Sequence, residues 1–99
     1  RACRVSSYRL TEDAERQVID IFYRFETLGP GQARLYKAEL ESVFRLLAEH
    51  PRMGRATDAV APGVRRHEHE SHVIFYEIQD DDILILAVLH GHSVKHLKM

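Results

Sequence analysis

The chain has 99 residues, of which 44% are hydrophobic and 29% are charged, and its formal net charge at pH 7 is -1. These values are ordinary for a soluble globular chain, so they exclude a disordered chain and an overall charge that would draw it to nucleic acid or to an anionic membrane. The single cysteine, Cys3, excludes an internal disulfide and a cysteine-based zinc site, and no apolar run reaches the roughly 18 residues of a membrane span. We predict one domain over residues 1–99. The first residue is arginine and not methionine, so whether residues 1–3 belong to the natural sequence is left open. Residues 92–99 are left as a tail without an assigned structure.

The first third of the chain predicts a short strand and then a helix. Residues 4–10 alternate between two faces, as a strand does. Thr11 is a good helix N-cap, and Glu12 and Asp13 place negative charge in the first turn, where the helix dipole favours it. Apolar residues then recur at steps of three and four until glycine and proline at 29–30 stop the pattern. The first helix is predicted from Glu12 to Leu28.

A second helix is predicted to begin at Pro30, since proline is tolerated in a first helical turn, and to end at Glu49. Its apolar stripe consists of Ala33, Tyr36, Leu40, Val43, Phe44 and Leu47. Because only two or three residues separate the helices, they must form an antiparallel hairpin whose shared apolar side can lie on a sheet. Residues 51–63 are rich in turn residues and are predicted to be irregular.

Three strands are predicted in the last third of the chain, at Val64–His69, His72–Ile78 and Ile83–Leu89. The last two are apolar on both faces, which places their hairpin at the centre of a sheet. The first of the three carries several charges and is predicted to be an edge strand. The fold class is therefore α+β, with two layers, the order β-α-α-β-β-β and a helical hairpin packed on an antiparallel sheet.

Five segments of the sequence together resemble a known family, and they span nearly everything from Tyr8 to His90. They read YRLTEDAERQVIDI, GPGQARLYKAEL, LLAEHPRMGR, PGVRRHEHESHVIFYEI and ILILAVLHGH. The chain resembles the ParE toxins of bacterial, plasmid-stabilisation type II toxin-antitoxin systems, within the RelE/ParE superfamily. The resemblance implies a four-stranded sheet of order 1-4-3-2 and a cytoplasmic toxin without cofactors. It also implies inhibition of DNA gyrase by protein binding and neutralisation by a ParD-like antitoxin in a hetero-oligomer.

Two alternatives to a gyrase inhibitor stay open. RelE-like relatives cut messenger RNA on the ribosome, and here Arg65, His72 and His90 would be the catalytic groups. Those ribonucleases usually carry arginine in the middle strand where this chain has His72. This difference favours a gyrase inhibitor, in which no residue is catalytic. After His90, ParE toxins often continue with a basic residue and Met-Asp, whereas this chain has Gly91 and His92. The second alternative is therefore an antitoxin-binding module without toxicity.

The predicted contact residues fall into two sets. Contacts with the target are expected from Arg65, His72, His90 and His92, as protein contacts and without nucleic-acid or membrane specificity. Both helices carry more apolar surface than one buried face requires, which predicts a bound partner helix. The predicted antitoxin groove consists of Ile19, Phe22, Tyr23, Leu35, Tyr36 and Leu46. No metal site is predicted, because neither the His67 and His69 pair nor the His92 and His96 pair has a third ligand nearby in the sequence.

Overall fold

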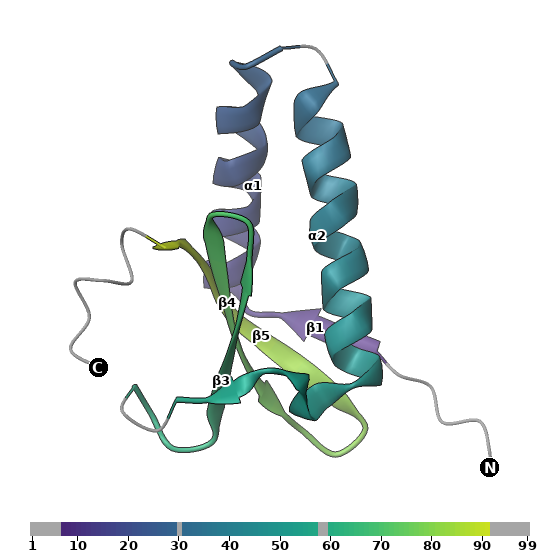
Figure 1. The fold of residues 1–99 in the computed structure, drawn as a ribbon, viewed down its shortest axis with the longest axis vertical. Coiled ribbons are helices and arrows are strands. Elements are labelled where there is room, and N and C mark those ends of the chain that lie inside the picture. Colours follow the sequence, from purple (N-terminus) through teal and green to yellow (C-terminus); the bar gives the residue numbers. More distant parts are fainter. Residues whose placement is uncertain (1–6, 30, 58–59, 92–99) are drawn as a thin grey trace.

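The computed structural model describes residues 7–29, 31–57 and 60–91, and it has two layers (Figure 1). The helices α1 (Glu12–Glu26) and α2 (Gln32–Glu49) stand side by side, and their connected ends extend beyond the sheet (Figure 1). The strands are β1 (Ser7–Leu10), β2 (Arg55–Ala56), β3 (Val64–His69), β4 (His72–Ile78) and β5 (Asp82–His90). The α+β fold class is confirmed. No helix within the described residues is long and apolar enough to cross a membrane.

The five-stranded sheet has the order β1-β5-β4-β3-β2, so the β4–β5 hairpin lies at its centre as predicted. The prediction of an antiparallel sheet is wrong at one pair, because β1 runs parallel to β5 from Ser7 opposite Asp82 to Leu10 opposite Ile85. These two strands are separated in the chain by the helical hairpin and three other strands, so no tight turn forces them to be antiparallel.

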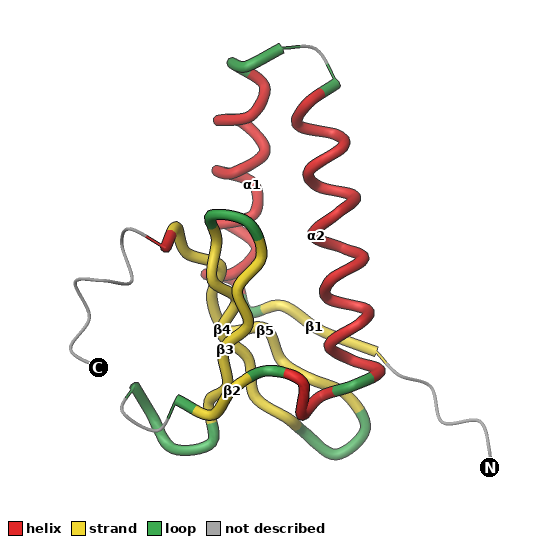
Figure 2. Tube along the Cα trace, in the orientation of Figure 1, coloured by secondary structure: helices red, strands yellow, loops and turns green. Residues whose placement is uncertain are grey.

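Residues 51–63 were predicted to be irregular, and this prediction is wrong in part. The 3-10 helix η1 (Pro51–Met53) follows α2, and β2 then pairs with Arg65 and Arg66 of β3 (Figure 2). Strand β3 is therefore covered at these two residues and is not an edge strand there. A two-residue strand is too short to give a periodic sequence signal.

The helix boundaries follow the predictions to within two residues. Helix α1 ends at Glu26 rather than Leu28, and α2 begins at Gln32. Gly31 caps α2 at a φ of 86°, a left-handed conformation that glycine adopts without steric cost. Residues 4–6 of the predicted first strand, Pro30 and the tail 92–99 lie outside the described residues.

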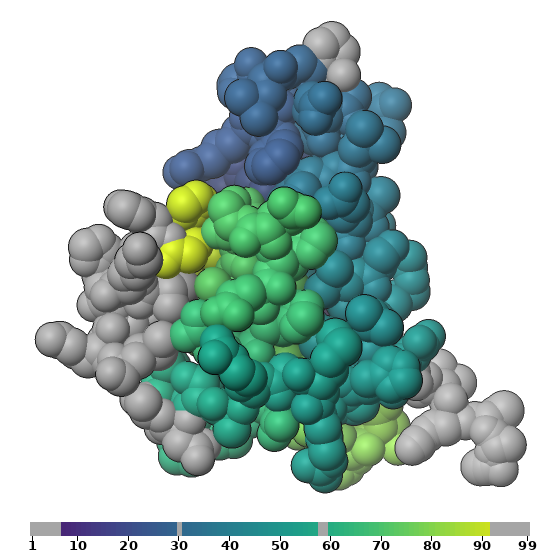
Figure 3. All heavy atoms as spheres, in the orientation of Figure 1, coloured from purple at the N-terminus to yellow at the C-terminus, as the bar shows by residue number. Residues whose placement is uncertain are grey.

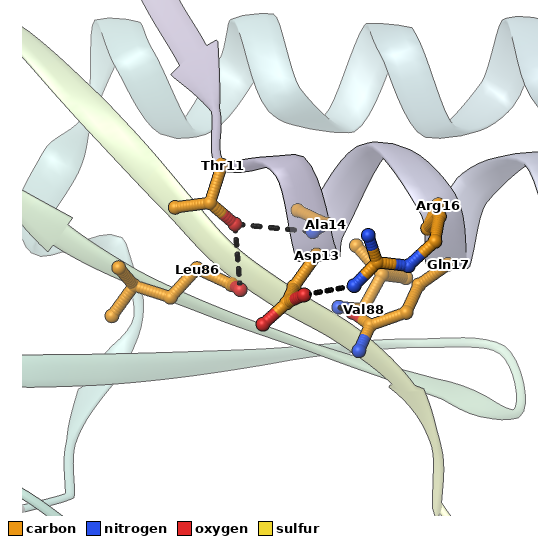
Figure 4. Close-up of polar contacts among 7 residues, drawn as sticks. All are labelled: Thr11, Asp13, Ala14, Arg16, Gln17, Leu86 and Val88. Carbon is orange, nitrogen blue, oxygen red and sulfur yellow. Dashed lines mark hydrogen bonds and ion pairs between the residues drawn. The ribbon is translucent and has the colours of Figure 1, made fainter.

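The start of α1 is fastened to β5 by side-chain hydrogen bonds (Figure 4). The Thr11 hydroxyl accepts from the backbone N–H of Ala14 at 3.1 Å, which confirms the N-cap, and donates to the carbonyl of Leu86 at 3.1 Å. The β4–β5 register shifts at this point, opposite residues 75–76, as a bulge would require. Six residues after Thr11, Gln17 Oε1 accepts from the N–H of Val88 at 2.8 Å, beyond the end of the β1–β5 pairing. Along β5, hydrogen bonds from β1 therefore end at Ile85, and Gln17 of α1 binds the strand further on, at Val88.

The hydrophobic core lies mainly between the helices and the sheet. Its buried residues are Ala14, Ile21, Tyr36, Leu40, Phe44, Leu47, Ala48, Ile74, Tyr76, Ile83, Ile85 and Val88. The opposite face of the sheet carries a smaller cluster, in which Val73 and Phe75 pack with Val64 and Ala61. The Arg66 guanidinium lies 5.8 Å from the centre of the Phe75 ring. Both faces of β4 are thus covered, as its apolar sequence predicts.

Candidate functional site

Two of the predicted target-contact residues, His72 and His90, lie together at one end of the central hairpin. They are directly opposite each other in the β4–β5 register, and their ring centroids are 5.6 Å apart in an edge-to-face arrangement. His72 is buried, with 6% of its surface exposed, whereas His90 is exposed. The hairpin therefore presents one imidazole to solvent and holds the other beneath the helices.

The His72 ring is fixed by Tyr36 of α2, whose hydroxyl lies 2.8 Å from His72 Nδ1. Burial lowers the pKa of His72 below the ordinary 6.5. Positive groups nearby lower that pKa further, with His90 contributing more than His69 and Arg24. Because each of these neighbours disfavours a second positive charge, His72 is held neutral at pH 7.

The Tyr36 hydroxyl keeps its proton, because burial and nearby negative charges disfavour the phenolate. Burial raises the pKa of Tyr36 to about 12, and the negative charges of Glu70 and Glu39 add to this effect. A protonated Tyr36 can donate to the neutral Nδ1 of His72. The Tyr36 ring also stacks on Phe25 of α1, with centroids 4.4 Å apart. Tyr36 of α2 therefore contacts the sheet through its hydroxyl and α1 through its ring.

A cavity of about 290 Å³ opens between α1 and this end of the hairpin. His72, His90 and Ser71 line one side of it, and Asp20 and Arg24 of α1 line the other. The two α1 residues were missed in the sequence, where the only available signal was a pair of opposite charges four residues apart on a helix. The cavity combines two imidazoles, a guanidinium, a carboxylate and a hydroxyl, which suits it to polar contacts with another molecule.

The buried state of His72 predicts a pH-dependent stability. Because the pKa of His72 is lower in the folded chain than in the unfolded one, its contribution is complete above about pH 6.5 and is lost as the pH falls below that value. We expect His72→Asn, whose amide can replace Nδ1 as the partner of Tyr36, to lose less stability between pH 7.5 and pH 5.5 than the wild type. Urea unfolding at both pH values, with a chelator present because the chain has seven histidines, measures this.

The exposed His50 at the end of α2 provides the matched control. His50→Asn should keep the pH dependence of the wild type. An equal loss of stability at pH 5.5 in the wild type and in His72→Asn would contradict the assignment of this pH dependence to His72.

Arg65 does not join the two histidines. Its Nε donates to the carbonyl of Gly54 at 3.0 Å, and a terminal nitrogen donates to the carbonyl of Arg52 at 3.4 Å. Arg65 lies four residues along β3 from His69, the partner of His72, which is about 13 Å at the rise of a strand. The three groups proposed for a ribonuclease are therefore not assembled in one site. His92, the fourth predicted contact residue, lies outside the described residues.

The predicted antitoxin groove is divided between two sides of the helical hairpin. Ile19, Phe22 and Tyr23 line an apolar cavity of about 250 Å³ together with Val18 and with Lys37 of α2. Ile19 is 51% exposed and Tyr23 is 62% exposed, so both offer apolar surface to a partner.

The other three predicted groove residues lie elsewhere. Leu35 and Leu46 are both exposed and are about three helical turns apart, so they share one side of α2. That side is about 200° around the helix axis from Lys37 and therefore from the apolar cavity. Tyr36 is buried, with 7% of its surface exposed, and belongs to the core.

Comparisons with known proteins agree with the two-layer fold. Residues 8–94 match the family model described as the ParE toxin of the type II toxin-antitoxin system parDE. The chain is 37% identical over 84 residues to Toxin ParE1 of Caulobacter vibrioides, a match that covers 84% of this chain and 86% of that protein. It is 32% identical over 87 residues to Toxin ParE1 of Mycobacterium tuberculosis, covering 86% of this chain and 89% of that protein.

Two solved structures share the fold. The chromosomal ParDE toxin-antitoxin system from P. aeruginosa superimposes with a TM-score of 0.72 at 20% identity, covering 89% of this chain and 98% of that chain. The RelBE2 toxin-antitoxin complex from Mycobacterium tuberculosis gives a TM-score of 0.64 at 24% identity, covering 86% of this chain and 96% of that chain. The family model spans most of the chain, and the curated relatives exceed 30% identity over most of their length. The chain therefore belongs to the ParE family of toxins of type II toxin-antitoxin systems.

Proposed function

We propose that the chain inhibits DNA gyrase by binding to it in the cytoplasm, without catalysis of its own, and that a ParD-like antitoxin neutralises it. The observation that carries this proposal is the position of Arg65. Its guanidinium is bound to the carbonyls that shape residues 52–54, so it is not available to neutralise a phosphate beside His72 and His90. That observation argues against the ribonuclease alternative, and the choice of gyrase rests on what resemblance to the ParE family implies, a family to which the chain belongs.

The contact with gyrase is proposed to centre on His90. It is exposed at the mouth of the 290 Å³ cavity, beside Arg24 and Asp20 of α1. His72 lies beneath it and acts as a positioning residue, because its ring contacts the His90 ring and is itself held by Tyr36. A contact of this kind weakens in steps when single side chains are removed, whereas a catalytic site loses activity by orders of magnitude.

The antitoxin is proposed to place an amphipathic helix in the apolar cavity at Ile19, Phe22 and Tyr23. This cavity lies between α1 and α2, with Lys37 at its margin. A partner helix with apolar residues at steps of three and four would cover the exposed rings and methyl groups, while Lys37 keeps its ion pair with Glu41 at 3.5 Å.

Purified chain, free of antitoxin, tests the proposed target when it is added to gyrase, supercoiled plasmid and ATP. We expect linear DNA to accumulate after detergent and protease treatment, and added antitoxin to suppress it. His90→Ala should raise the concentration required by roughly tenfold, the effect of a single interface side chain worth about 1.4 kcal/mol. The control His50→Ala should behave as the wild type.

The two alternatives give different outcomes in the same preparation. Cleavage of ribosome-bound messenger RNA, lost by orders of magnitude in His72→Ala, would establish the ribonuclease reading instead. Absence of linear DNA, in a preparation that still binds antitoxin, would overturn the proposed inhibition of gyrase, and harmless expression without antitoxin would identify a binding module without toxicity.

A further inference from the structure

Three metal-ligating side chains meet where α2 approaches the β3–β4 turn. They are Glu39 of α2, His69 at the end of β3 and Glu70 in the turn, and one ligand atom of each lies within 4.8 Å of the other two. Nε2 of His69 lies 3.4 Å from Oε1 of Glu39. In Figure 3 the green atoms of the β3–β4 turn lie against the blue-green atoms of α2.

His69, the central residue of these three, is held in place by its strand pairing and by ring stacking. His69 pairs with His72 at the closing position of the β3–β4 hairpin. Its ring stacks on the buried Tyr36 ring, with centroids 5.7 Å apart and planes 28° apart. Glu39 follows Tyr36 by three residues and so emerges from the neighbouring side of α2. Tyr36 therefore packs against the imidazole, and Glu39 leaves the same helix one turn further on.

No metal site was expected from the sequence because the histidine pairs lacked a third ligand nearby, and the structure supplies further ligands. The sequence offered His67 and His69 on one strand face without a third ligand nearby. The structure brings Glu39, thirty residues earlier in the chain, to His69, and the turn adds Glu70. Such a site depends on how α2 lies across the sheet, so no spacing within one element reveals it.

We propose that His69, Glu39 and Glu70 bind a transition-metal ion of the Zn²⁺ class, with water completing its coordination. Imidazole nitrogen favours Zn²⁺, Ni²⁺ or Cu²⁺ over Mg²⁺ and Ca²⁺, which take oxygen ligands. One imidazole and two carboxylates supply three ligands, the number that open protein zinc sites commonly provide. A divalent cation also relieves the repulsion between two neighbouring carboxylates.

The bound ion would add a link between two elements that are already joined by the stacking of His69 on Tyr36 and by the 3.4 Å contact of His69 with Glu39. It would fasten the β3–β4 turn to α2 beside Tyr36, and therefore beside the hydrogen bond from Tyr36 to His72. Because the three ligands are assembled only in the folded chain, the ion would stabilise the folded state by mass action.

The test uses the full chain, first stripped with a chelator and then titrated with Zn²⁺ in a calorimeter. We expect one site on the wild type and a rise of the thermal midpoint with Zn²⁺ but not with Mg²⁺. Glu39→Gln and Glu70→Gln keep the size of each side chain and should weaken binding at least about tenfold, because even partners that do not touch a metal cost that much. His69→Ala should abolish binding at this site.

Matched controls separate this site from the other histidines of the chain. His50→Ala, at the exposed end of α2, and the double variant His92→Ala/His96→Ala should bind Zn²⁺ as the wild type does. NMR shifts on adding Zn²⁺ to the wild type should be largest at His69 and its neighbours. Unchanged affinity in His69→Ala, loss of binding in the His92→Ala/His96→Ala variant, or absence of Zn²⁺ binding would each overturn the proposal.

Discussion

Replacing Gly54 with alanine is expected to destabilise the chain by about 3 kcal/mol, the upper part of the range for overpacking a well-packed site. A Cβ at this position would lie 2.4 Å from the Tyr76 hydroxyl oxygen and 2.8 Å from the backbone carbonyl oxygen of Arg66. Neither atom can move easily. Tyr76 is completely buried, and its hydroxyl accepts from the Gly54 N–H at 2.9 Å and donates to the Pro51 carbonyl at 2.6 Å.

Urea unfolding of Gly54→Ala measures this loss, and Tyr76→Phe is the natural companion. Removing the hydroxyl leaves a buried N–H and a carbonyl without their partner, which costs about 1–3 kcal/mol. In the double variant the closest contact of the new methyl group is gone, so its destabilisation should be smaller than the sum of the two single changes. A Gly54→Ala chain within about 0.5 kcal/mol of the wild type, the range of an ordinary surface change, would show that η1 and β2 shift without cost.

The same tyrosine explains why residues 51–63 were predicted poorly. Helix α1 and strands β3 and β4 follow from local periodicity, and their predicted boundaries agree with the structure to within two residues. The conformation of residues 51–56 is instead held by Tyr76 and Arg65, which come from later strands. No pattern within a short segment encodes contacts of that kind.

In the candidate site, too, contacts within one hairpin follow from the sequence, whereas contacts between a helix and the sheet do not. The sequence places His72 and His90 at the same end of the hairpin, because the turn sets the register to within one residue. Their direct pairing depends on the bulge at residues 75–76, since the turn register alone would put Leu89 opposite His72. The approach of Arg24 to His72, and of Glu39 to His69, depends on how each helix lies across the sheet. The division of the predicted groove has a similar origin, since Leu35 and Tyr23 are both exposed but lie on different sides of the hairpin.

Introducing charge into the apolar cavity is expected to weaken antitoxin binding by more than about 100-fold. Ile19→Glu or Tyr23→Glu would place a carboxylate where the proposed partner helix buries apolar surface. Lys37 lines the same cavity but already pairs with Glu41 at 3.5 Å. Burying a further carboxylate at the centre of an interface costs more than the roughly 2.7 kcal/mol that corresponds to 100-fold. Both side chains are more than half exposed in the chain alone, at 51% and 62%, so the substitutions should leave its own stability nearly unchanged. Titration of each purified variant with the antitoxin measures the affinity.

Two control positions decide which surface the antitoxin uses. Ile78 at the end of β4 is also an exposed isoleucine, at 38%, and Ile78→Glu introduces the same charge beside the end of α2, away from the apolar cavity at Ile19 and Tyr23. Leu35→Glu tests the opposite side of α2. If the antitoxin occupies only the cavity at Ile19 and Tyr23, both controls should bind with nearly wild-type affinity. Equal losses in Leu35→Glu and Ile19→Glu would mean that the antitoxin wraps both sides of the hairpin, and a loss confined to Leu35→Glu would place it on the side that also carries Glu39, where it would cover the proposed metal ligands.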